Sequence, residues 1–107
     1  MKNAIAAVVV IGFSFAAHDS VAQAPGDLVE GLATARQVCA ECHAIEKEQM
    51  TSPNSKSPTF LKLANTPGMT SIALSAALTT PHAGMPMFVL SADQRANIIA
   101  YILSLKE

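Results

Sequence analysis

The sequence has 107 residues, half of them apolar, and its formal net charge at pH 7 is −1. This length suits a single domain. The near-neutral charge excludes nucleic acid as a partner, because binding to phosphates needs a clear excess of cationic side chains.

The first 24 residues have the pattern of a secretory signal peptide. Lys2 supplies the positive start, the stretch 4–17 is mostly apolar, and Ala22-Gln23-Ala24 has the small-x-small form of a cleavage site. A membrane anchor is the alternative, but the apolar stretch falls short of the roughly 20 residues that span a bilayer. We therefore expect residues 1–24 to be removed. The domain at 25–107 should then have no membrane span and be periplasmic or otherwise exported.

The first helix of this domain is predicted from Asp27 to about Val38, because apolar residues recur there at helical spacing. Asp27 can cap the helix, and Glu30 lies three places later, as in a capping box. The stripe expected to face inward consists of Leu28, Leu32, Ala35 and Cys39. A polar surface loop is expected at 46–57.

Two shorter helices are predicted after this loop. One covers Phe60 to Ala64, and the other is capped by Thr70 and runs to about Leu78, before Thr80-Pro81 ends it. The expected apolar side of the second consists of Ile72, Leu74, Ala77 and Leu78.

The stretch 81–90 is apolar, but its prolines and glycine prevent a regular helix, so we expect a loop lying against an apolar surface. Ser91 then caps a last helix, with Gln94 at the third helical position. Its buried stripe is expected to consist of Ile98, Tyr101, Ile102 and Leu105. Since no segment shows strand alternation, the predicted fold class is all-α, with three or four short helices.

The motif that carries chemistry is Cys39-Ala40-Glu41-Cys42-His43, a C-x-x-C-H sequence, which is the attachment signature of c-type haem. The two thiols add to the two vinyl groups of haem, and His43 follows at once as the proximal iron ligand. A domain this small usually needs a disulfide, a metal or a bound cofactor such as haem for its stability. A thioredoxin-like dithiol would belong beside a βαβ pattern, which is absent. A structural zinc site would need four ligands.

The other face of the iron needs a second ligand. Met85 is favoured because Gly84 permits close approach of the backbone and Pro86 holds its neighbour extended. His82 could compete, but it lies at the start of the loop and is interpreted as a surface or propionate-facing residue. Methionine–histidine ligation is the cytochrome c pattern and raises the potential. The remaining methionines are Met50, Met69 and Met87.

With these motifs the sequence resembles class I cytochrome c in its small bacterial mono-haem form. Gly31 matches the family's glycine at the crossing of the first and last helices, where Ile98 and Tyr101 match the apolar–aromatic pair. Ser57-Pro58-Thr59-Phe60 resembles the family's Gly-Pro-x-Leu segment, which implies that the Pro58 carbonyl orients His43. Ala35 stands where the family usually has an aromatic residue.

The resemblance implies a class I cytochrome c fold around one covalently bound haem c. The implied function is transfer of single electrons between redox proteins, without catalysis, by a monomer. The haem edge has no ring of lysines, so the partner cannot be inferred from the mitochondrial type. Two alternatives stay open: a small subunit through which electrons enter an exported dehydrogenase, and a haem-based ligand sensor.

Overall fold

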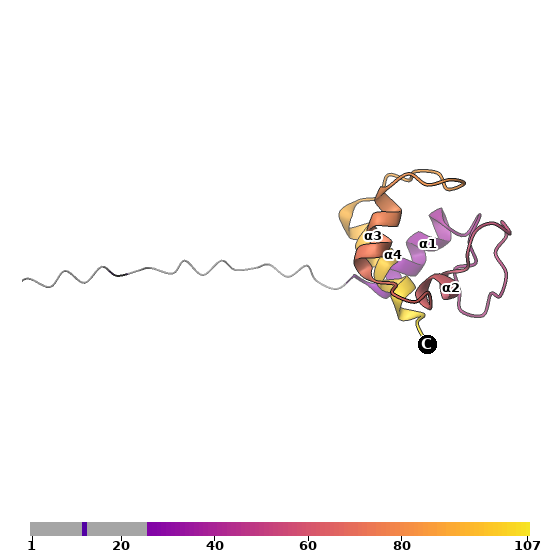
Figure 1. The fold of residues 1–107 in the computed structure, drawn as a ribbon, viewed down its shortest axis with the longest axis horizontal. Helices are drawn as coiled ribbons and strands as arrows, with labels where there is room; N and C mark the ends of the chain where they lie inside the picture. The colour runs from indigo at the N-terminus through magenta and orange to yellow at the C-terminus, as the bar shows by residue number, and fades with distance from the viewer. Residues whose placement is uncertain (1–11, 13–25) are drawn as a thin grey trace, which may run out of the picture.

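The computed structural model describes residue 12 and residues 26–107. The described domain contains four helices: α1 (Leu28–Val38), α2 (Phe60–Ala64), α3 (Ser71–Thr79) and α4 (Ala92–Ser104) (Figure 1). Within these ranges no strand forms, and the only extended pairing is an isolated bridge between His82 and Met85. The all-α prediction is therefore confirmed. The predicted signal peptide lies, apart from Gly12, outside the described residues.

Both long helices begin at the predicted caps. At α4, the Ser91 hydroxyl accepts from the Gln94 N–H (3.1 Å) and the Gln94 side chain accepts from the Ser91 N–H (3.0 Å), which confirms the capping box. At α1, the Asp27 carboxylate accepts from two backbone N–H groups of the first turn. The Asp27 N–H is not bonded back within the cap, because it donates to the Asn97 side chain at 2.8 Å. This bond joins the start of α1 to α4.

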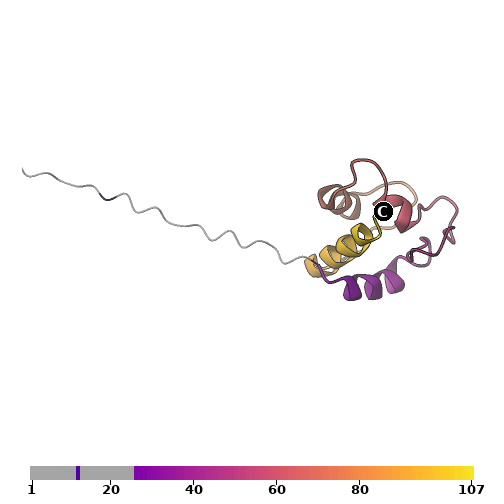
Figure 2. The ribbon, with the colours of Figure 1, turned by 90° about the horizontal axis from the view of Figure 1, so that it is seen from below.

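The core of the domain is the packing of α1 against α4, with α2 and α3 also lying on α4 (Figure 2). Gly31 is buried at the crossing, and a Cβ there would meet the backbone of Asn97 and lie 2.8 Å from Tyr101 Cβ. A glycine is thus required by the close approach of the two helices. The predicted stripe of α4 is confirmed, since Ile98, Tyr101, Ile102 and Leu105 are all buried.

Three predicted core positions are wrong, because Leu28, Ile72 and Ala77 are exposed. Leu28 is 48% exposed, because the chain at the start of α1 contacts α4 through the backbone of Gly26 and Asp27 rather than through side chains. Ile72 is 80% exposed. It lies about 200° around the helix from Leu74, which is buried, and among the described helices α3 packs against α4 alone. None of the helices in the described part of the chain has the length and apolar character needed to cross a membrane.

Tyr101 joins α4 to the segment that follows the C-x-x-C-H motif. Its hydroxyl donates to the Ile45 carbonyl at 2.8 Å in a buried bond between residues 56 positions apart. We expect Tyr101→Phe to lower the free energy of unfolding by about 1–3 kcal/mol, since the Ile45 carbonyl is left without its partner. Urea denaturation of the two proteins measures this difference.

The same variant should change the dependence of stability on pH. Burial raises the pKa of the Tyr101 hydroxyl above its usual value of 10.0, and the charge of Glu46 adds to the rise. The unfolded chain therefore loses this proton at a lower pH than the folded one, so stability falls as pH rises above about 10. Tyr101→Phe should remove that part of the fall in stability. Identical pH profiles above about pH 10 would contradict the assignment.

Candidate functional site

The C-x-x-C-H motif forms a turn directly after α1. The Cys39 N–H donates to the Ala35 carbonyl (2.8 Å), and the N–H groups of Cys42 and His43 both donate to the Cys39 carbonyl (3.2 and 2.9 Å). Both cysteines are free thiols; Cys39 is buried and Cys42 half-buried. Burial raises the pKa of the Cys39 thiol to about 11, so it stays protonated at neutral pH. The two thiols are unpaired and thus available for thioether bonds.

The His43 side chain is held by the backbone at the start of α2. Its Nδ1 lies 2.6 Å from the Pro58 carbonyl oxygen, and because a carbonyl can only accept, Nδ1 carries the proton in this contact. Nε2 of the neutral ring then has a free lone pair, as a metal ligand requires. Phe60 packs against the ring, with centroids 5.6 Å apart. The Phe60 N–H donates to the Ala44 carbonyl at 2.9 Å, which ties α2 to the residue after His43.

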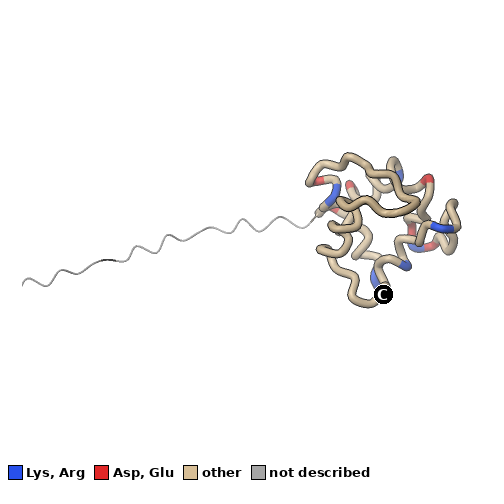
Figure 3. Tube along the Cα trace, turned by 45° about the horizontal axis from the view of Figure 1, so that its top comes forward, with Lys and Arg blue, Asp and Glu red and all other residues tan. Residues whose placement is uncertain are grey.

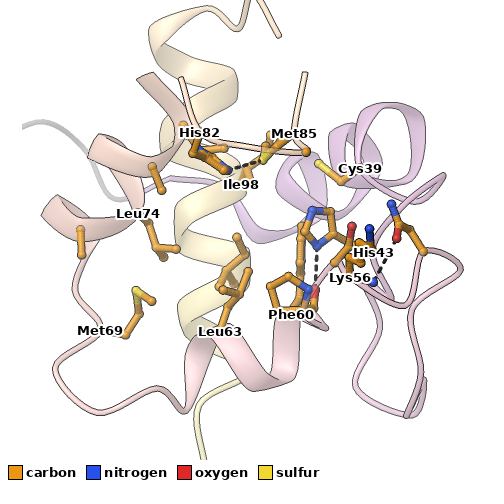
Figure 4. Close-up of a pocket in the computed structure, with 18 of the residues that line it drawn as sticks. Cys39, His43, Lys56, Phe60, Leu63, Met69, Leu74, His82, Met85 and Ile98 are labelled. Atoms are coloured by element: carbon orange, nitrogen blue, oxygen red, sulfur yellow. Dashed lines mark hydrogen bonds between the residues drawn. The ribbon is translucent and has the colours of Figure 1, made fainter. Parts of the chain in front are cut away.

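His82 and Met85 occupy one turn of the loop between α3 and α4. The Met85 N–H donates to the His82 carbonyl (3.4 Å), and Gly84 has φ of 81°, a conformation that favours glycine. His82 Nε2 lies 3.1 Å from Met85 Sδ. His82 Nδ1 lies 3.2 Å from the Thr80 carbonyl. The two side chains thus meet at one point (Figure 4).

A cavity of about 490 Å³ separates His43 from the turn that carries His82 and Met85. The His43 ring presents one edge to its hydrogen-bond partner and the other toward the side where His82 and Met85 lie (Figure 4). Most of the other lining residues are apolar and come from α2, α3 and α4, among them Leu63, Leu74 and Ile98. Among the residues that line this cavity, Lys56 alone has a formal charge. The cavity therefore suits a large apolar group bound between two facing ligands.

Four of the five predicted site residues line this cavity: Cys39, His43, Pro58 and Met85. Cys42 is not among the lining residues. Among the other methionines, Met69 lines the cavity, whereas Met50 (77% exposed) and Met87 (53%) do not. The contact between His82 and Met85 was missed from sequence. Their spacing of three residues across a glycine was the signal that could have indicated it.

The prediction that the whole 81–90 loop lies against an apolar surface is wrong. Phe88 is 39% exposed and Val89 fully exposed, while Met85 and Leu90 are half-buried. Within 81–90 the one backbone hydrogen bond outside helices runs from the Met85 N–H to the His82 carbonyl, so no such bond holds residues 86–90 against the domain. Residues 63–92 contain no Lys, Arg, Asp or Glu, so none of the blue or red positions in Figure 3 belongs to this segment.

The alternative chemistries for the two cysteines find little support in the fold. Among the described residues, no group of three or more His, Cys, Asp or Glu side chains lies close enough together to hold a metal ion. A thioredoxin-like dithiol belongs to a βαβ unit, and the described domain is helical.

Comparisons with known proteins agree with one another. A family model described as "Cytochrome c" matches residues 28–106. Cytochrome c-552 of Bradyrhizobium diazoefficiens is 33% identical over 90 residues, which cover 84% of this chain and 86% of that protein. No solved structure gave a significant match.

Proposed function

The chain belongs to the cytochrome c family, and from this premise we propose that it is an exported mono-haem electron carrier with iron ligated by His43 and Met85. Family membership establishes the haem and the electron-carrying role in general terms. The number of haems, the attachment through Cys39 and Cys42, and the two iron ligands are the proposed part.

The residues around the cavity fit a haem group. Two unpaired thiols stand at the spacing of the attachment signature, and one of them, on Cys39, lines an apolar cavity of about 490 Å³. The observation that carries the proposal is the 2.6 Å contact between His43 Nδ1 and the Pro58 carbonyl. It holds the ring in the tautomer that leaves Nε2 free, which is the usual arrangement around a metal-binding histidine.

Met85 is the proposed distal ligand because it lines the cavity on the side opposite His43 (Figure 4). The positive φ of Gly84 sets the turn that carries it, and Pro86 restricts the backbone on its other side. Met69 also lines the cavity, but it packs against the hydrophobic core and stays assigned to packing.

This ligand set suits electron transfer rather than catalysis. Bound haem supplies an iron that gains or loses one electron. If His43 and Met85 both bound the iron, no coordination position would be left for a substrate. The apolar lining and the soft thioether both disfavour the extra charge of ferric iron and so raise the potential.

Export and partners complete the proposal. The signal-peptide pattern of residues 1–24 supports an exported domain at 25–107, periplasmic in a Gram-negative host. The partners are redox proteins, and a monomer is expected. Since residues 63–92 bear no acidic or basic side chain other than His82, encounter on that side should not depend on charge steering.

The test is a comparison of Met85→Ala with Met87→Ala. Loss of the thioether in Met85→Ala should abolish the weak band at the red edge of the visible spectrum that marks methionine bound to ferric haem, and should lower the potential. Met87 is 53% exposed, so Met87→Ala should keep the band and change the free energy of unfolding by no more than about 0.5 kcal/mol. Absorption spectra and a redox titration measure both effects.

The outcomes separate the functions as well as the ligands. If Met87→Ala loses the band while Met85→Ala keeps it, the distal ligand is Met87 rather than Met85. The proposed function as an electron carrier is unaffected by that result. A wild-type reduced protein that takes up carbon monoxide readily at neutral pH would overturn the electron carrier in favour of a ligand sensor.

A further inference from the structure

The turn at the distal side of the cavity presents two groups that can bind a metal ion, not one. His82 and Met85 both line the cavity opposite His43, and His82 Nε2 lies 3.1 Å from Met85 Sδ. Gly84, between them, brings the two side chains to the same side of the turn through its φ of 81°. A metal ion bound by Met85 could therefore be reached by His82 after only a short movement of the loop.

The hydrogen bonding of His82 leaves Nε2 able to act as a ligand. Its Nδ1 lies 3.2 Å from the Thr80 carbonyl, which can only accept, so the tautomer that forms this bond has the proton on Nδ1 and a lone pair on Nε2. Nε2 also lies 3.1 Å from the Met85 sulfur, a weak acceptor to which the other tautomer donates. When the Met85 side chain is removed, only the bond to the Thr80 carbonyl remains. His82 is then held in the tautomer that presents a metal-binding lone pair at the wall of the cavity.

The loop can exchange one group for the other because little else holds it. Outside the helices, its one backbone hydrogen bond is from Met85 N–H to the His82 carbonyl, and His82 is exposed. The proximal side differs, since Pro58 and Phe60 both hold the His43 ring. Exchange of ligands is thus possible at the distal side without disturbing the proximal one.

We propose that His82 is a second distal ligand, whose Nε2 binds the iron whenever the Met85 thioether is removed or displaced. The proposal rests on the His43/Met85 site proposed above. Imidazole is a good ligand for iron, and thioethers belong to the softer class of ligands. The consequence is that loss of Met85 leaves the iron with a nitrogen ligand on both sides and still closed to small molecules.

The experiment compares Met85→Ala with Met85→Ala/His82→Ala in the haem-loaded protein. The single variant should have low-spin ferric iron without the methionine band, and the double variant should be high-spin. Carbon monoxide should bind the reduced double variant freely. If His82 occupies the position in about nine of ten molecules, the single variant should show an apparent affinity for carbon monoxide about tenfold lower. Electron paramagnetic resonance and carbon monoxide titration give the two results.

Two further variants make the result specific. Lys56 also lines the cavity, so Met85→Ala/Lys56→Ala should stay low-spin if the ligand is His82. Met85→Leu keeps the side-chain volume and should behave as Met85→Ala does, should the alanine variant fold poorly. Besides His43, His82 is the only histidine in residues 25–107, so an imidazole signature within one molecule has no other source.

A Met85→Ala protein that is high-spin and binds carbon monoxide as well as the double variant would overturn this proposal. So would loss of the low-spin state on replacing Lys56. Neither result would affect the assignment of Met85, which depends on the methionine band of the wild-type protein. Absence of that band in the wild type would instead contradict the function proposed above.

Discussion

A Cys39→Ser/Cys42→Ser variant is expected to release all of its haem to acidified organic solvent, whereas the wild-type protein retains it on the polypeptide. The reason is that both proposed covalent bonds are thioethers, which denaturation does not break. The haem-free chain should also be poorly folded, because a group bound only by the native state stabilises that state. The cavity of about 490 Å³ lies among α2, α3 and α4, whose apolar lining would face water without haem. Solvent extraction and far-ultraviolet circular dichroism measure the two effects.

Three controls accompany this variant. Each single replacement, Cys39→Ser or Cys42→Ser, should leave one thioether and a shifted absorption band. Ala40→Ser introduces the same side chain between the two cysteines and should leave both bonds intact. Free haem extracted from the wild-type protein would contradict the covalent attachment, whatever the spectra of the variants.

Gly31→Val is expected to be the most destabilising single replacement on α1. A Cβ at Gly31 would overlap the backbone of Asn97 and come within 2.8 Å of Tyr101 Cβ, and backbone cannot move aside as a flexible side chain can. Overpacking typically lowers the free energy of unfolding by about 1–3 kcal/mol. Because the neighbouring backbone is rigid, the loss in Gly31→Val should be at or above the upper end of this range. A domain of this size has only about 5–10 kcal/mol of stability in total. Thermal and urea denaturation of the haem-loaded protein measure the loss.

The matched control is Gln37→Val, which places the same side chain at an exposed position of α1. It should change the free energy of unfolding by no more than about 0.5 kcal/mol. The loss of stability in Gly31→Ala should lie between those of Gly31→Val and Gln37→Val, since its single methyl group meets the same backbone atoms. Equal stability of Gly31→Val and Gln37→Val would show that the two helices do not cross as closely as the structure has them.

Features encoded within a few consecutive residues could be predicted from the sequence. The C-x-x-C-H motif indicates haem attachment by its spacing alone, and the caps at Asp27, Thr70 and Ser91 all start helices where expected. The inward stripe of α4 followed from its periodicity. In each case the relevant partners lie within one or two turns of the helix, so the local sequence determines the outcome.

Contacts between distant residues were decided only by the tertiary structure. Leu28 and Ile72 have the spacing of buried residues but are exposed, because burial depends on where α4 lies and not on periodicity alone. The Asp27–Asn97 bond joins residues 70 positions apart, and Tyr101 meets Ile45 across 56.

The candidate site divides in the same way. Sequence alone named Cys39, His43 and Met85, because a local motif or a local turn carries each of them. The contact of His82 with the Met85 sulfur depends on the backbone conformation of Gly84 and on the Thr80 carbonyl that holds the imidazole ring. Both groups could be named as ligand candidates from their chemistry. That their donor atoms meet at one wall of the cavity follows only from the folded chain, because side-chain direction in an irregular loop is set by torsion angles that no periodicity encodes.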